Sequence, residues 1–224
     1  MFAVIFEVQP RQDRWDDYIR IAASLRPDLE NIDGFIANER FTSQHREGRV
    51  LSLSIWRDEK AVVRWRTLAR HHQAQALGRS EIFVDYHLRV GEITADNRLP
   101  PGQNLVQQRF DVTEIGTAKL ATITELAARG SAPADLAAEL GLPQSGAEVV
   151  DHESFAAIND PEKLLLLASW ADPLAARAWQ PADTRAASHH RVVRIIRDYG
   201  LLDRREAPQY HPPVTAEINS TESR

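Results

Sequence analysis

The chain has 224 residues, of which 43% are apolar, and a formal net charge of -5. It contains no cysteine, which excludes disulfides, thiolate metal sites and cysteine nucleophiles. Neither half is basic, which argues against a nucleic-acid partner. No apolar run approaches the roughly 20 residues of a membrane span, and the N-terminus lacks the pattern of a signal peptide, so we expect a cytoplasmic protein.

The first part of the chain predicts the element order β-α-β-β-α-β. Its strands are short, apolar and rich in β-branched residues, and its helices carry one apolar stripe each. This order is that of the ferredoxin-like split βαβ pattern, whose sheet leaves one apolar face open. The predicted strands cover residues 2–8, 35–43, 50–55 and 82–90, and the predicted helices cover residues 13–30 and about 59–77.

A strand-and-helix segment occurs twice. VLSLSIWRDEKAVVRW at residues 50–65 and LLLLASWADPLAARAW at residues 164–179 share the frame W-x-D-x6-W. In both copies an apolar run predicts a buried strand, and Asp58 or Asp172 then stands where the N-cap of a helix belongs. The chain therefore carries an internal repeat, which changes the predicted architecture.

The remainder of the second half predicts the same order. Residues 105–112 are interpreted as its first strand, 118–128 as a helix, 149–158 as a strand and 195–202 as the last strand. Two further pairs strengthen the alignment, because His71-His72 and His189-His190 are 118 residues apart, and Asp85-Tyr86 and Asp198-Tyr199 are 113 apart.

We therefore predict an α+β protein in which two ferredoxin-like repeats pack open face to open face and close one barrel. The predicted boundaries are residues 1–95 for the first repeat, 96–103 for a linker, 104–211 for a second, diverged repeat and 212–224 for a disordered polar tail.

Four segments of the first repeat carry a resemblance to a known family: FAVIFEV, IDGFIANERF, SLSIWRDEKAVVRWRTLARHH and DYHLRV. With them, residues 1–95 resemble the antibiotic biosynthesis monooxygenase family of dimeric α/β-barrel proteins, and the second half resembles a diverged copy. The resemblance implies a cofactor-independent monooxygenase that acts on a small aromatic, phenol-like substrate and dioxygen. It also implies that the pairing of two subunits is internal here, with further homo-oligomerisation left open.

A substrate phenol that is to be ionised needs a base, a partner for its anion and a dry pocket. We predict His72 as the base, because imidazole titrates near neutral pH, and His190 as its counterpart in the second half. Trp56 is predicted to wall the pocket and Arg66 to hold the phenolate. In quinone-forming relatives an Asn and a Tyr stand where this chain has Ser52 and Val62.

Two alternatives remain open. In haem-degrading relatives the His that binds iron lies ten residues after a helix Trp, and His189 follows Trp179 at that spacing. If haem is bound, these two residues are the expected cofactor site; otherwise no cofactor and no metal site are predicted. The second alternative is a barrel that binds small molecules or serves a structural role without catalysis, in which the histidines are helix-end or solvent groups.

Overall fold

The computed structural model describes residues 1–128, 135–144, 146, 148–160, 162–182, 188–212 and 214. Most of the tail predicted to be disordered lies outside these residues. The elements of the first half are β1 (Phe2–Pro10), α1 (Trp15–Glu30), β2 (Phe35–Ser43), β3 (Val50–Trp56), α2 (Glu59–Thr67), α3 (Ala69–Leu77) and β4 (Phe83–Asp96). Those of the second half are β5 (Leu120–Ala127), α4 (Leu136–Glu139), β6 (Val149–Ala157), β7 (Lys163–Trp170), α5 (Pro173–Ala178) and β8 (His189–Gly200).

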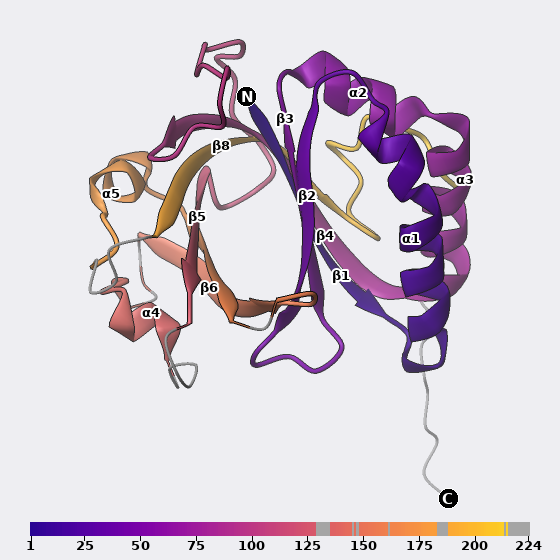
Figure 1. The fold of residues 1–224 in the computed structure, drawn as a ribbon, viewed down its shortest axis with the longest axis horizontal. Coiled ribbons are helices and arrows are strands. Elements are labelled where there is room, and N and C mark those ends of the chain that lie inside the picture. The colour runs from indigo at the N-terminus through magenta and orange to yellow at the C-terminus, as the bar shows by residue number, and fades with distance from the viewer. Residues whose placement is uncertain are drawn as a thin grey trace, which may run out of the picture.

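The strands form one closed barrel in the order β1-β3-β2-β6-β7-β5-β8-β4 (Figure 1). Each half contributes four neighbouring strands, and their relative order is the same in both halves. Two antiparallel seams join the halves. In one seam Phe41 of β2 pairs with Ala157 of β6, and in the other Leu88 of β4 pairs with Tyr199 of β8. The α+β class is confirmed, and both halves share a single barrel.

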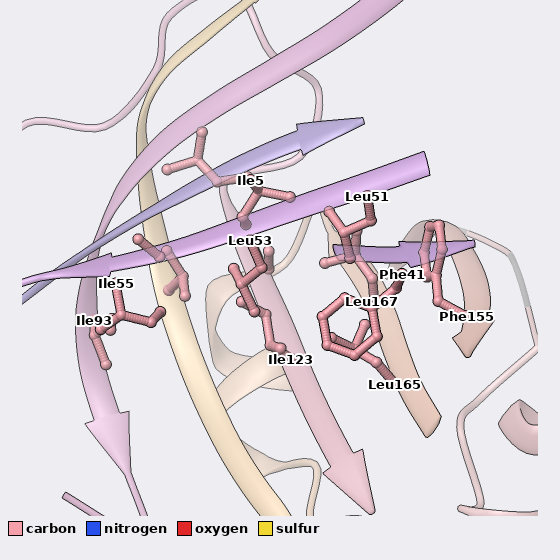
Figure 2. Close-up of a cluster of buried hydrophobic side chains, with 14 of the residues drawn as sticks. Ile5, Phe41, Leu51, Leu53, Ile55, Ile93, Ile123, Phe155, Leu165 and Leu167 are labelled. Atoms are coloured by element: carbon pink, nitrogen blue, oxygen red, sulfur yellow. The ribbon is translucent and has the colours of Figure 1, made fainter. Parts of the chain in front are cut away.

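Aliphatic and aromatic side chains fill the barrel (Figure 2). They come from strands of both halves, because every second residue of a strand points inward. Examples are Ile5 and Leu53 from the first half and Ile123 and Leu167 from the second. Neither half encloses this core alone, so each shields the apolar face of the other from water.

The outer faces of the two half-sheets are covered differently. Helices α1, α2 and α3 lie over the first-half strands, and α4 and α5 lie on the opposite side of the barrel (Figure 1). The two helices of the second half are short, with four and six residues respectively.

The two copies of the repeated segment have the predicted local structure. The Asp58 carboxylate accepts a hydrogen bond from the Ala61 amide at 2.8 Å, and the Asp172 carboxylate accepts one from the Leu174 amide at 2.7 Å. Both N-cap predictions are therefore confirmed. The two strand tryptophans also occupy equivalent positions, because Trp56 pairs with the first residue of β1 and Trp170 with the first residue of β5.

The second half contradicts two predicted elements. Residues 105–112 form no regular structure, and residues 118–128, predicted as a helix, contain strand β5. In β5, Ala121 and Ile123 face the barrel while Leu120 and Leu126 face the outer core. Because residues of both faces are buried, and Thr122 and Thr124 share a face with Leu120 and Leu126, the alternation of apolar and polar residues that marks a half-buried strand is hidden in the sequence.

This correction also changes the alignment of the last strands. Glu92 pairs with the first residue of β1, and Arg194 pairs with the first residue of β5, so the shift between β4 and β8 is 102 residues (194 minus 92). The histidine pairs and the Asp-Tyr pairs are therefore not equivalent positions. His71 and His72 belong to helix α3, whereas His189 and His190 begin strand β8.

Candidate functional site

A cavity of about 220 Å³ lies between the outer face of the first-half sheet and the helices α1 to α3. Outward side chains of β1, β2, β3 and β4 form its floor, and the three helices form its roof. Most of the lining is apolar, including Val4, Phe6, Ile21, Ala22, Leu25, Leu29, Val62, Leu88 and Val90. An apolar, preformed cavity with a few polar groups is the usual form of a small-molecule site.

The second half completes this cavity. Across the β4–β8 seam Arg197 lies opposite Val90 and Tyr199 opposite Leu88, and all four line the cavity. The segment after β8 adds Arg204, Gln209 and His211. The site is therefore built from both ends of the chain, although its helices belong to the first half.

Five arginines that line the cavity have no carboxylate within salt-bridge distance in the described part of the chain. Glu59 also lines the cavity, but it pairs with Arg109 at 2.8 Å. A cationic cavity in a protein of net charge -5 favours an anionic ligand. The five are Arg40, Arg66, Arg79, Arg197 and Arg204.

Two imidazoles line the cavity, that of His211 from the segment after β8 and that of His71 from α3. The His71 ring stacks on Trp65 at 4.0 Å, and Nδ1 lies 2.9 Å from the Trp65 carbonyl oxygen. Since a carbonyl only accepts, Nδ1 carries the proton and Nε2 keeps a lone pair. Burial lowers the pKa of His71 to about 4, so the ring is neutral at pH 7. A neutral imidazole with a free nitrogen can accept a proton.

His72, the base predicted from the sequence, is exposed and does not line the cavity. It contacts the C-terminal segment, where its ring stacks on His211 at 5.1 Å and Nδ1 lies 3.3 Å from Nε2 of Gln209. Adjacent helix positions point about 100° apart, so only one of the two histidines can face inward. The backbone turns at Leu68, where α2 ends and α3 begins, and this directs His71 toward the cavity.

Trp56, predicted to wall the pocket, is fully buried in the layer between the sheet and the helices, but it does not line the cavity. Its indole N–H donates to Ser54 Oγ at 2.9 Å, and its ring packs edge-on against Phe35. Trp65 lines the cavity instead. The tryptophan of helix α2 is thus the one that a ligand in this cavity can touch.

Arg66 lies on the cavity wall, as the sequence prediction requires. The residue is half-buried, its Nε has no hydrogen-bond partner in the described residues, and burial lowers the pKa of its guanidinium. Arg66 is therefore a cation in partly dry surroundings, where its charge acts more strongly than in water.

The second half has its candidate residues in a packed core. Trp179 packs on Trp170 at 5.7 Å and edge-on against His190 at 5.3 Å. Burial lowers the pKa of His190 to about 4, and its Nδ1 lies 2.9 Å from Thr124 Oγ1. Neither His190 nor Trp179 lines the cavity described above.

His189 does not have the form of a haem ligand. Its Nε2 lies 2.7 Å from Asp96 Oδ1, and its Nδ1 lies 3.0 Å from Nη2 of Arg191. Both ring nitrogens are occupied, so neither is left for iron. Within the described residues no group of three or more His, Asp or Glu side chains is placed to hold a metal ion.

No helix in that part of the chain is long and apolar enough to cross a membrane.

Comparisons with known proteins decide the family. The sequence pattern of the antibiotic biosynthesis monooxygenase family matches residues 1–77. A protein of Pyricularia oryzae named jasmonate monooxygenase is 43% identical over 221 residues, which are 96% of this chain and all of the relative. The chain belongs to the antibiotic biosynthesis monooxygenase family.

Solved structures of such proteins are more distant. One described as an antibiotic biosynthesis monooxygenase is 15% identical, covers 45% of this chain and all of that protein, and has a TM-score of 0.38. One described as an anthrone oxidase-like protein is 11% identical, covers 93% of this chain and 96% of that protein, and has a TM-score of 0.36.

This family member has a second cavity, of about 520 Å³, at one end of the barrel. Its charges are largely compensated. Glu7 pairs with Arg49 at 2.9 Å and with Arg89, and His87 pairs with Asp198 at 2.6 Å. The nearby guanidinium groups hold the pKa of Glu7 below its usual value despite burial. The charge balance distinguishes this cavity from the helix-covered one.

The sequence analysis missed His71 as a site residue, and it missed Arg79 and Tyr199. A helical wheel through Val62 and Trp65 does not extend to His71, because the helix axis changes at Leu68. The role of Tyr199 depends on the β4–β8 seam, which joins residues far apart in the chain. No local pattern marks Arg79 as buried, because it stands between Gly78 and Ser80 and Glu81 follows.

Proposed function

We propose that the protein is a monooxygenase that binds a small, mostly apolar organic acid, jasmonate or a close analogue, in the helix-covered cavity. The observation that carries the proposal is the set of five arginines without carboxylate partners, within the described residues, on a mostly apolar lining. Jasmonate combines one carboxylate with a compact cyclopentanone ring and an apolar pentenyl chain, which matches a mostly apolar lining with a few polar groups. The name of the 43% identical relative supports the same substrate.

Three groups of this chain suit oxygen chemistry in the cavity. Neutral His71 is placed to accept a proton through Nε2, and Trp65 holds its ring by stacking. Arg66 is placed to stabilise negative charge that develops on the substrate or on reduced oxygen. The helices α1 to α3 exclude bulk water, which strengthens both effects.

The electron balance separates two substrate classes. Inserting one oxygen atom of O2 into a C–H bond leaves the other atom to be reduced to water by two electrons and two protons. Jasmonate hydroxylation therefore needs an added reductant, such as a reduced flavin or nicotinamide. A phenol that is converted to a quinone and water supplies all the electrons itself. The phenol reaction, without any cofactor, is the second candidate. It is favoured because neutral His71 and the cation Arg66 line the same cavity.

Oxygen uptake by the purified protein tests the proposal. Jasmonate and a panel of phenols are supplied with and without reduced flavin or nicotinamide, with a chelator present or absent, and products are identified by mass spectrometry. We expect jasmonate to be oxygenated only when reductant is present. Quinone formation from a phenol without reductant would select the second candidate, and no oxygen uptake under any condition would reject both.

A matched pair of variants ties the activity to the cavity. Arg66→Gln removes a cation from the wall and should lower kcat/KM by about 10–100-fold, the usual effect of losing a charge-assisted hydrogen bond. Arg64→Gln is the control, because exposed Arg64 on the same helix pairs with Asp33 outside the cavity. Equal losses in both variants would contradict the assignment.

We also infer that the two halves are a tandem repeat of one ferredoxin-like unit. The shared strand order and the equivalent capped segments support this origin. Residues 1–95 expressed alone should then be insoluble or unfolded, because the inner face of their sheet would meet water. A folded, soluble monomer of this fragment would contradict the idea that each half depends on the other.

A further inference from the structure

Arg79 occupies an unusual place in the cavity. It lies in a π-helical turn, Gly78–Ile82, between α3 and β4, and it is only 4% exposed. Such turns are rare and are frequently found at functional sites. The turn packs closely, since a Cβ added at Gly78 would lie 2.5 Å from the Phe83 ring. Arg79 is therefore held deep in the wall by the local backbone.

Half of the Arg79 guanidinium is firmly bound. Nη1 donates to the hydroxyl oxygen of Tyr86 at 2.6 Å and to the Leu201 carbonyl oxygen at 3.2 Å. Arg204 donates to the same Tyr86 oxygen, also at 2.6 Å. Tyr86 and Leu201 thus fix the orientation of the Arg79 side chain.

The other half has no partner. Nε and Nη2 are buried and make no hydrogen bond in the described part of the chain, and no carboxylate there pairs with Arg79. Leaving a buried donor unmet is unfavourable, and a buried charge without a counter-ion is more so. A protein does not normally keep such a group unless something else satisfies it.

Other unmet polar atoms gather around the same cavity. Six of the eleven buried side-chain atoms without a partner, counted over the described residues, belong to residues that line it. They include the hydroxyl of Tyr18, which is 6% exposed. The six are Tyr18 Oη, Arg40 Nε, Arg66 Nε, Gln75 Oε1, Arg79 Nε and Arg79 Nη2.

We propose that Arg79 binds the acid group of the substrate through Nε and Nη2. These two N–H groups form one edge of the planar guanidinium, and that edge matches the two oxygens of a carboxylate. The inference rests on the proposed function only for the class of substrate, an organic acid. Arg79 is preferred over Arg66, which is half-buried, and over Arg204, whose two terminal nitrogens donate to Tyr86 and to the Gln209 carbonyl.

Binding of an acid and of its neutral ester tests the assignment without any turnover. Jasmonate and methyl jasmonate have nearly the same shape, and only the acid offers a carboxylate. Titrations by calorimetry, or by the fluorescence of Trp65 in the cavity wall, give both affinities for the full-length protein. We expect unmodified protein to bind the acid more tightly than the ester.

Variants then locate the carboxylate. Arg79→Gln should weaken acid binding by about 10–100-fold, while ester binding stays nearly constant. Arg79→Lys keeps the charge without the two-pronged edge, so it should retain part of the preference for the acid. Arg64→Gln, exposed on α2, is the control and should behave as unmodified protein. If Arg79→Gln does not fold, as judged by circular dichroism, Arg79→Lys carries the test.

Several outcomes would overturn the proposal. The first two are that unmodified protein binds the acid and the ester with equal affinity, or binds neither. The third is that the Arg79 variants lose affinity equally for the acid and for the ester. The fourth is that Arg66→Gln loses the preference for the acid while Arg79→Gln keeps it. Failure of oxygen uptake together with Arg79-dependent acid binding would reject the proposed reaction and leave this site standing.

Discussion

The two halves of the barrel have the same strand order, but one encloses a cavity beneath its helices and the other a packed core. In the first half, Ser52 and Ser54 of β3 form part of the cavity floor, beneath three helices. The residues at the same register in the second half, Leu166 and Ala168 of β7, belong to a packed core with Trp179. Replacing two serines by apolar residues removes the polar floor, and short helices then pack directly onto the sheet. One half holds the helix-covered cavity, and the other supplies a packed core and the strand β8, which pairs with β4 at the seam.

The largest expected contrast concerns the histidines of α3. His71→Ala removes the neutral imidazole from the cavity and should lower the turnover rate by about 10²–10⁴-fold, the usual contribution of a positioned base. His72→Ala should leave most of the turnover, because His72 is exposed. Steady-state turnover rates of the two variants, compared with unmodified protein, measure this contrast. A loss confined to His72→Ala would restore the base predicted from the sequence.

Opening the core of the second half should affect stability instead of activity. Trp179→Ala should reduce the free energy of unfolding by about 3–5 kcal/mol, because the ring is 8% exposed and packs on Trp170. Denaturant unfolding gives this value. Trp65→Ala is the matched change in the first half, and it should weaken ligand binding with a smaller loss of stability. The reverse pattern would mean that the second half holds the ligand.

Acid should destabilise both halves through their buried histidines. The folded-state pKa of His71 and of His190 is about 4, below the ordinary value of 6.5, so between these values the unfolded chain binds the proton and the folded chain does not. The stability that these neutral histidines contribute is therefore fully present above pH 6.5 and is lost as the pH falls toward 4. In His190→Phe, the loss of unfolding free energy between pH 6.5 and 4 should be smaller by about 1–3 kcal/mol. An unchanged profile in His190→Phe would contradict the burial of a neutral ring.

The smallest expected effect is common to both halves. Asp58→Ala and Asp172→Ala each remove an N-cap and should each cost about 1 kcal/mol of stability, with no direct effect on turnover. Thermal unfolding measures the loss. If Asp172→Ala abolished activity without changing the melting temperature, the carboxylate would have a chemical role.

The sequence was informative where local rules decide the structure. The four first-half strands and both N-caps follow from periodicity and capping. The second half was misread at β5, because Ala121 and Ile123 alternate with other buried residues and no polar face marks the strand. The site was only partly foreseen, since the choice of His71 over His72 depends on a bend at Leu68, and the contribution of Tyr199 depends on a seam between distant strands.

The two β seams make the linker dispensable for holding the halves together. The turn that contains Gly102 is exposed and has open space around its backbone, and nothing in the barrel closure passes through it. Residues 1–101 and 102–224 produced as separate chains would still recognise each other through β2 with β6 and β4 with β8. The cavity would then lie between two polypeptides and form only on their reassembly, so ligand binding would report complementation of a split protein.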